Sequence, residues 1–316
     1  MLLRLLTLLM LLGGLPCASA AALSIDRALT AQGSGASFPI DTPTLAVGLP
    51  DEWSRTRPGA GGPVWYRVNF TLPTAASADA LQALYIAQVC TNFEVQLNGQ
   101  LIDSGGRMQA PLTHNCNHPQ LVLLPTALLV AGSNVLDIKV AGHALARVGS
   151  RHRAAQLSVL EVGPLSELAP RHAQRTALNV SLPQALGATL LLMGSFMFVM
   201  GFTQRRDSHL AYFGALCVGW ALIDARLWLR EIPLAHSVAE LLLAAMLPFI
   251  TMAAVQFLLR YARTRVHWVD VALPLQCALM PISLIVAGPG RLYACVLAWE
   301  LLFALQVVPP PRCTCA

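Results

Sequence analysis

The feature that most constrains this chain is a series of long apolar runs in its C-terminal half. Each run is close to the roughly 20 residues that an α-helix needs to cross the hydrocarbon core of a bilayer. We therefore expect an all-α bundle of five transmembrane helices, followed by a short tail at 309–316 whose composition suggests a truncated or out-of-frame end. The five predicted spans are residues 182–202, 209–229, 237–259, 266–287 and 292–308.

The composition supports a membrane protein and is uneven along the chain. Apolar residues make up 55% and charged residues 12%, against roughly 45–50% and 25% in soluble domains. The surplus lies in residues 1–23 and 182–308, whereas 24–181 have an ordinary composition. The net charge of +5 comes from scattered arginines without a basic stripe, so we expect no nucleic-acid partner.

Residues 1–20 have the pattern of a secretory signal peptide. Arg4 precedes an apolar stretch at 5–12, and Ala18-Ser19-Ala20 is a small-residue cleavage site. The alternative is an uncleaved anchor helix. Cleavage predicts that the domain that follows is exported.

The arginines in the loops predict the orientation of the helices, because loops on the cytoplasmic side carry an excess of positive charge. The first and third interhelical loops hold five arginines and the opposite loops hold two. We expect the five to be cytoplasmic, in the inner membrane of a bacterium. The five are Arg205, Arg206, Arg260, Arg263 and Arg265, and the two are Arg230 and Arg291.

Residues 21–165 predict an extracytoplasmic all-β sandwich, with a juxtamembrane linker at 166–181. Short alternating or β-branched runs recur at 64–72, 81–89, 93–97, 100–102, 120–124, 135–140 and 155–162. Such spacing is typical of antiparallel sandwiches. Asn98-Gly99 lies between two of these runs and predicts a tight hairpin, because a type I′ turn needs positive φ at both central residues.

The exported domain contains two cysteines, Cys90 and Cys116. An oxidising compartment would let them form a disulfide. The alternative is two small buried hydrophobic residues, a common environment for free cysteine.

Several of these segments resemble known proteins. Residues 65–70 (WYRVNF), 94–99 (EVQLNG) and 128–140 are similar to the jelly-roll sandwich of galactose-binding-like and glycosidase sugar-binding domains. With residues 89–92, 104–108 and 182–185, the chain resembles the N-terminal sensor half of bacterial receptors that have seven transmembrane helices and diverse intracellular signalling modules. Within that family it is most similar to sensor histidine kinases.

The resemblance covers about residues 45–305 and implies a sensor that passes a signal to a cytoplasmic two-component output. The chain differs from the family in two ways. It shows five apolar spans where seven are expected, and nothing after Val308 has the pattern of a kinase. We therefore expect no catalytic residues, cofactor or metal in this chain.

Polar residues in the loops of the sandwich are candidates for ligand binding, because binding residues often lie on loops held by a rigid scaffold. The alternatives are ordinary turn hydrogen bonds for the polar residues and a core position for the tryptophan. The candidates are Trp65, Asn92, Asp103, Arg107 and His118.

Asp224 and Arg226 lie within the second predicted span, where ionisable groups are costly and usually mark function or a buried pair. They could couple movement of the sandwich to the bundle. The alternative is snorkelling of the side chains, or pairing near the interface with Arg230, Glu231 or Glu240 as partners.

Signal reception is the function that these patterns favour. The expected partners are the bilayer, a small-molecule or carbohydrate ligand, a second copy of the chain, and a response regulator if a kinase domain accompanies it. The alternative is a membrane enzyme or transporter with an exported carbohydrate-binding accessory domain. That alternative would need polar residues deep in several spans.

Overall fold

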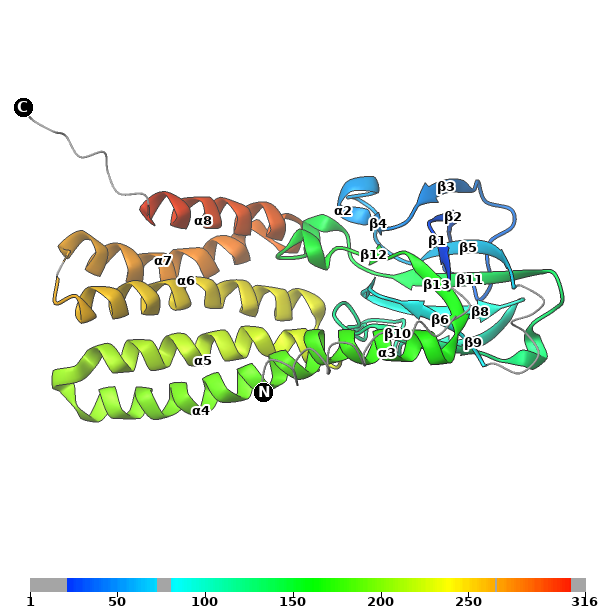
Figure 1. Cartoon of the computed structure of the whole chain (residues 1–316). Helices are drawn as coiled ribbons and strands as arrows, with labels where there is room; N and C mark the ends of the chain where they lie inside the picture. Colours follow the sequence, from blue (N-terminus) through cyan, green and yellow to red (C-terminus); the bar gives the residue numbers. More distant parts are fainter. Residues whose placement is uncertain (1–21, 73–80, 265, 308–316) are drawn as a thin grey trace, which may run out of the picture.

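The computed structural model describes residues 22–72, 81–264 and 266–307. It shows a β domain at one end and, at the other, a set of helices whose axes are roughly aligned (Figure 1). The predicted order, a β-sheet domain followed by a helical part, is confirmed. The predicted signal peptide at 1–20 and the tail at 309–316 lie outside the described residues.

Three antiparallel sheets form the β domain. The largest has the order β3 (Leu45–Gly48), β2 (Arg27–Gln32), β5 (Val64–Thr71), β11 (Ser133–Ala141), β8 (Asn92–Leu97) and β9 (Gln100–Ser104). The second has the order β1 (Leu23–Ile25), β13 (Leu160–Pro164), β6 (Gln82–Ile86) and β10 (Gln120–Leu124). A small third sheet joins β4 (Asp51–Glu52), β12 (Gln156–Leu157) and β7 (Val89–Cys90).

The hairpin predicted at Asn98-Gly99 is confirmed. The two residues have φ values of 50° and 84° and connect β8 to β9, which pair with each other. Positive φ at both positions is what a type I′ turn requires. The turn fixes the register of the strands that lead into the loop after β9.

A buried polar network lies around Tyr66 in the core of the sandwich. Trp53 Nε1 donates to Tyr66 Oη at 2.7 Å, and Tyr66 Oη donates to Asp51 Oδ2 at 2.7 Å. Arg57 also pairs with that carboxylate at 2.7 Å. Burial and the neighbouring Asp51 charge raise the pKa of Tyr66, so its hydroxyl stays a hydrogen-bond donor. Every member of the network has a partner, which is the condition for a polar group to be tolerated in a core.

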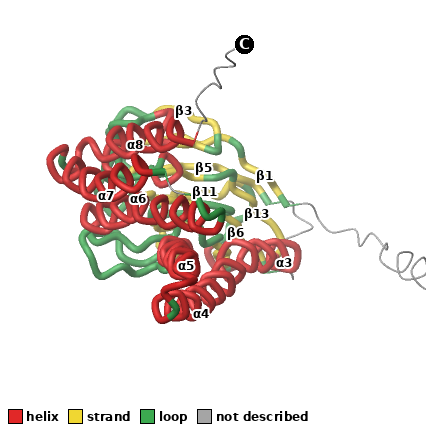
Figure 2. Tube along the Cα trace, turned by 90° about the vertical axis from the view of Figure 1, so that its left-hand side faces the viewer, coloured by secondary structure: helices red, strands yellow, loops and turns green. Residues whose placement is uncertain are grey.

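The helical part runs through α3 (Leu165–Thr176), α4 (Leu182–Thr203), α5 (Ser208–Trp228), α6 (His236–Tyr261), α7 (His267–Ala287) and α8 (Leu292–Val307). Figure 2 views these helices nearly end on, with α4 and α5 beside each other and α6, α7 and α8 forming the rest of the set. Short helices occur at Trp53–Thr56, Thr126–Leu128, Leu145–Arg147, Arg151–Arg153, Arg205–Asp207 and Pro289–Arg291.

Among the described residues, four helices are long and apolar enough to cross a membrane: Leu165–Thr203, α5, α6 and α7. The prediction of five spans is wrong on this count. Its fifth member is α8, which has 16 residues, fewer than the roughly 20 that a spanning helix needs.

The segment predicted as a linker, residues 166–181, is helical. α3 continues through a π-helical turn at Ala177–Ser181 into α4, which gives one helix of 39 residues. The first part of this helix packs on the four-stranded sheet, where Leu168 is buried with Ala83 and Tyr85. One helix therefore contacts the sandwich and also continues into the apolar bundle (Figure 1).

Glycines bring α4 and α5 into close contact. A Cβ added to Gly214 would lie 2.3 Å from the backbone nitrogen of Phe198, and one added to Gly201 would lie 2.1 Å from that of Ala211. Small residues at such positions allow the close backbone approach that drives association of membrane helices.

Candidate functional site

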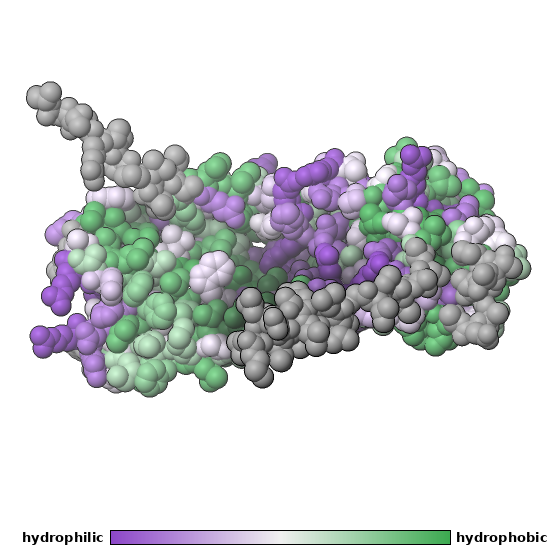
Figure 3. Space-filling model, in the orientation of Figure 1, coloured by the Kyte–Doolittle hydropathy of each residue, from purple (hydrophilic) through white to green (hydrophobic). Residues whose placement is uncertain are grey.

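A group of polar residues lies where the sandwich meets the helices. In Figure 3 hydrophilic side chains surround a hollow between the two parts, whereas the outer surface of the helices is mainly hydrophobic. The sandwich contributes the loops at 105–118 and 142–153, and the helical part contributes the end of α5, the start of α6 and the loop between them. We call this region the junction.

At the centre of the junction is Glu240, in the second turn of α6. Its carboxylate is fully buried and pairs with Arg226 of α5. It also accepts hydrogen bonds from Arg153 Nη1 at 3.1 Å and from the backbone N–H of Gly149 at 2.8 Å. A buried carboxylate is tolerated only when pairing and hydrogen bonds offset its desolvation. Glu240 therefore ties two helices to a loop of the sandwich.

Three histidines lie beside this carboxylate. The rings of His143 and His236 are stacked with centroids 3.5 Å apart, and His114 lies 6.3 Å from His236. Burial, and then the positive charge of Arg226, lowers the pKa of His114 to about 4. Burial and the neighbouring His236 lower the pKa of His143 to about 3. Both side chains are therefore neutral near pH 7.

The loop between α5 and α6 docks on the sandwich through Glu231 and Arg230. Glu231 pairs with Arg107 and accepts a hydrogen bond from Thr113 Oγ1 at 2.6 Å. The hydrogen bond from Thr113, and then the pairing with Arg107, lowers the pKa of Glu231. Arg230 Nη2 donates to the carbonyl of Gly105 at 3.1 Å. Each side of the junction supplies both donors and acceptors, because the N–H of His114 in turn donates to the carbonyl of Arg230 at 2.9 Å.

The predicted ligand residues do not form one open pocket. Trp65 is fully buried, in a cluster with Ala31 and Phe38, so its ring cannot stack on a ligand from solution. Asp103 accepts a hydrogen bond from the N–H of Ser104, which is ordinary turn chemistry. For these two residues the structure favours the alternative interpretation, a core position and a turn.

Asn92, Arg107 and His118 lie near one another at the junction. Asn92 is fully buried and its Nδ2 donates to the carbonyl of Arg107 at 2.7 Å. His118 Nε2 lies 3.2 Å from the carbonyl of Trp228, at the end of α5. These polar loop residues therefore contact the end of α5 and the loop after it, or support the loop that makes those contacts.

Asp224 and Arg226 have different neighbours in the structure. Arg226 pairs with Glu240, one of the three partners considered for it. Asp224 faces α4 instead, since a Cβ on Gly187 would lie 3.0 Å from its Oδ2, and that oxygen has no hydrogen-bond partner among the described residues. Of the two residues, Arg226 is linked to the sandwich, because its partner Glu240 also pairs with Arg153.

Cys90 and Cys116 are joined as a disulfide. The bond links β7 to the loop that carries Thr113, His114 and His118, all of which contact the helical part. It therefore restrains a loop that belongs to the junction.

Sequence reasoning did not find Arg153, His143 or the backbone of Gly149 as members of this site. The available signal was a lone carboxylate at the start of one apolar run and a lone arginine at the end of the preceding run. Antiparallel neighbouring helices place such residues at the same depth. Nothing comparable marks Arg153, because it is one of several arginines in a polar loop.

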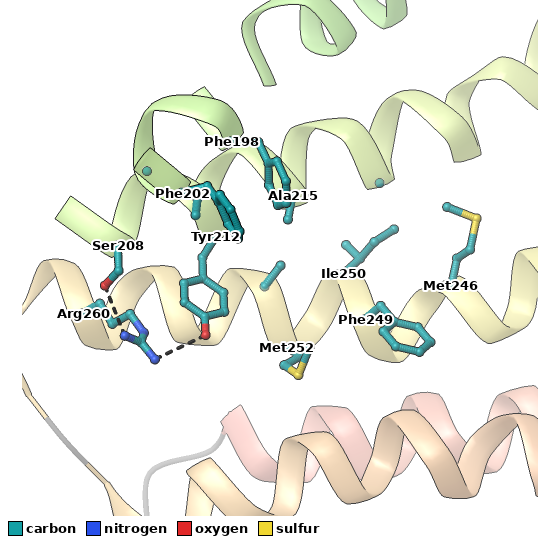
Figure 4. Close-up of a pocket in the computed structure, with 14 residues that line it drawn as sticks. Phe198, Phe202, Ser208, Tyr212, Ala215, Met246, Phe249, Ile250, Met252 and Arg260 are labelled. Carbon is teal, nitrogen blue, oxygen red and sulfur yellow. Dashed lines mark hydrogen bonds between the residues drawn. The ribbon is translucent and has the colours of Figure 1, made fainter. Parts of the chain in front are cut away.

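A second concave region lies on the membrane-spanning helices. It is a groove of about 810 Å³ between α4, α5 and α6, lined by apolar side chains that include Phe198, Phe202 and Phe249 (Figure 4). At one end Arg260 donates to Ser208 Oγ at 3.1 Å and to Tyr212 Oη at 3.2 Å. An apolar surface is expected where spanning helices face lipid, so the groove by itself assigns no ligand.

No protein-family model matches the chain, and no curated protein matches it. Glycoside hydrolases are among the solved structures that are partly similar to the chain. Beta-glucuronidase from Faecalibacterium prausnitzii is 19% identical with a TM-score of 0.33, and the matched region covers 48% of this chain and 33% of that enzyme. The enzyme from Bifidobacterium dentium is 17% identical with a TM-score of 0.37, covering 48% and 31%.

A glycosyl hydrolase family 2 member from Bacteroides cellulosilyticus is 18% identical with a TM-score of 0.35, and covers 45% of this chain and 20% of its own. The chain thus spans a third or less of the length of each of these neighbours. The similarity assigns no activity to this chain.

Proposed function

We propose that this chain is the sensing part of a membrane signal receptor, in which an extracytoplasmic jelly-roll sandwich receives a ligand and passes its movement to the helices through the junction. The observation that carries the proposal is the buried carboxylate of Glu240. It binds Arg153 of the sandwich and Arg226 of α5 at once. A shift of the loop at 149–153 must therefore change the contacts between α5 and α6, or leave a buried charge unpaired.

The continuous helix Leu165–Thr203 supports the proposal as a second connection. Its first part packs on the sandwich and its last part packs closely against α5 through Gly194 and Gly201. The π-helical turn at Ala177–Ser181 lies between the two parts, and such turns inside α-helices are frequent at functional sites. A ligand that favours one position of the sandwich would shift the population of helix arrangements by its differential affinity.

The bacterial inner membrane, the outward position of the sandwich and a two-component histidine kinase output are part of this proposal. They rest on the signal-peptide pattern, the distribution of arginines and the family resemblance. Reporter fusions after Thr264 and after Ile232 test the orientation. The proposal expects a cytoplasmic reporter to be active at Thr264 and a periplasmic reporter at Ile232, and the reverse result would overturn it.

Coupling is tested with paired spin labels at Thr203 and Tyr261, at the ends of α4 and α6 far from the sandwich. Arg153→Gln should change the distance distribution between the labels, because it breaks the contact of the sandwich with Glu240. The matched control is Arg55→Gln, which breaks an exposed pair with Glu52 within the sandwich and should leave the distribution unchanged. Identical distributions for Arg153→Gln and the wild type would contradict the proposed coupling.

A further inference from the structure

A small cavity at the junction has the chemistry of an anion site. Its volume is about 150 Å³, whereas sites for drug-sized ligands take roughly 300–1,000 Å³. It therefore admits only a small molecule or ion. Its polar lining includes Thr91, His114, Asn117, Ser150, His152, Arg153, Arg226 and His236.

The charges around this cavity do not balance. Arg153 and Arg226 bring two positive charges and Glu240 brings one negative charge, which leaves the cluster at +1. The other carboxylate of the junction, Glu231, is paired with Arg107 in the loop between α5 and α6. An anion in the cavity would restore neutrality where burial makes an unbalanced charge expensive.

One unused donor supports the same conclusion. The Arg226 side chain is 9% exposed, and while its Nη2 binds Glu240, its Nη1 has no hydrogen-bond partner among the described residues. Buried polar groups are nearly always hydrogen-bonded, and an exception needs a ligand, water or ion to explain it.

We propose that the junction cavity binds a small oxyanion, of the size of a carboxylate group or a phosphate, with Arg226 Nη1 as its main donor. Arginine suits this role because its planar guanidinium offers several donors in a fixed geometry. The inference deepens the proposed function and rests on it only for the signalling role of the site. The anion would come either from solution or from a lipid headgroup, since the cavity lies at the ends of membrane-spanning helices.

Inorganic phosphate is the probe for the test. It is titrated into the full chain in lipid-free detergent micelles at constant ionic strength, with isothermal calorimetry and the thermal midpoint as measurements. The wild type should bind one phosphate saturably, and the midpoint should rise with concentration because a ligand of the folded state stabilises it. A second arm adds phosphatidylglycerol to the micelles in place of phosphate.

The diagnostic variant is His152→Asp, which places a negative charge on an exposed residue at the edge of the cavity without removing a partner of Glu240. It should weaken phosphate binding at least tenfold. The matched control, His267→Asp, changes an exposed histidine at the start of α7 and should leave binding unchanged. Stabilisation of the wild type by phosphatidylglycerol alone, abolished in His152→Asp, would support the site and identify the headgroup as its source.

Failure of both anions to bind, or equal binding by His152→Asp and the wild type, would overturn the anion site. That result leaves the spin-label experiment of the preceding section unaffected. Conversely, anion binding together with unchanged helix distances in Arg153→Gln would overturn the proposed coupling while leaving the site in place.

Discussion

Replacing Glu240 by glutamine should cost more stability than any surface charge of the sandwich. The substitution keeps the size of the side chain and removes its charge. Arg226, with a side chain only 9% exposed, is then a buried cation without a counter-charge. Arg153 is 27% exposed and can turn toward water, so the main penalty comes from Arg226.

The magnitude follows from the burial of the pair. Removing one partner of a buried ion pair costs about 3–5 kcal/mol, because the other charge stays desolvated. We therefore expect Glu240→Gln to lower the free energy of unfolding by about 3–5 kcal/mol. The measurement is a denaturant titration of the full chain in detergent micelles, followed by tryptophan fluorescence.

The matched control is Glu52→Gln. Glu52 pairs with Arg55 at the surface, where the two side chains are 37% and 69% exposed, and such pairs contribute about 0–1 kcal/mol. The double variant Arg226→Met with Glu240→Met should recover most of the loss, because apolar residues often replace a buried pair without penalty. A loss in Glu240→Gln no larger than that in Glu52→Gln, or a double variant worse than the single one, would refute this reasoning.

Three further predictions concern other parts of the chain. The pKa of His114 in the folded state is about 4, below its ordinary value of 6.5. The free energy of unfolding should therefore fall as the pH decreases from 6.5 to 4, because the unfolded chain takes up the proton first. His114→Asn should reduce this loss by about 3 kcal/mol in unfolding titrations, whereas His267→Asn should leave it unchanged. Tyr66→Phe should lower the free energy of unfolding by about 1–3 kcal/mol, because it leaves the buried indole N–H of Trp53 without an acceptor and removes one of the two donors to Asp51 Oδ2; an unchanged unfolding midpoint would contradict this. Gly214→Leu should separate α4 from α5 at a cost of about 1–3 kcal/mol or more, whereas Gly59→Leu, whose Cβ would meet nothing within 4 Å, should be neutral in the same titration.

The parts of the fold that depend on local patterns could be predicted from the sequence. The apolar runs of α4 to α7 and the Asn98-Gly99 turn are determined by residues adjacent in the chain. The start of the last helix was also predicted at residue 292, but its assignment as a span was wrong, because the 16 residues of α8 are fewer than the roughly 20 that cross a hydrocarbon core. The helix Leu165–Thr176 was missed because its apolar residues are few and Pro170 lies within it.

The candidate site could not be assembled from the sequence, because its members are far apart in the chain. Arg153 and Glu240 are separated by 87 positions. Polar loop residues such as Asn92 and Arg107 have the same composition whether they face a ligand or a neighbouring part of the protein. The topology that brings the bundle onto these loops decides between the two.

The position of Arg226 near the end of α5 also sets a limit on the bilayer around this protein. From Ser208 to Ile223, the part of α5 before Asp224, there are 16 residues, or about 24 Å of helix at 1.5 Å per residue. A typical hydrocarbon core is about 30 Å thick. The membrane must thin by several ångströms beside α5, or the rim of the sandwich must enter the headgroup layer to shelter the polar end of the helix. Either adjustment makes the distance of the sandwich from the bilayer centre depend on lipid chain length. A change in membrane thickness would therefore change the contacts of the junction.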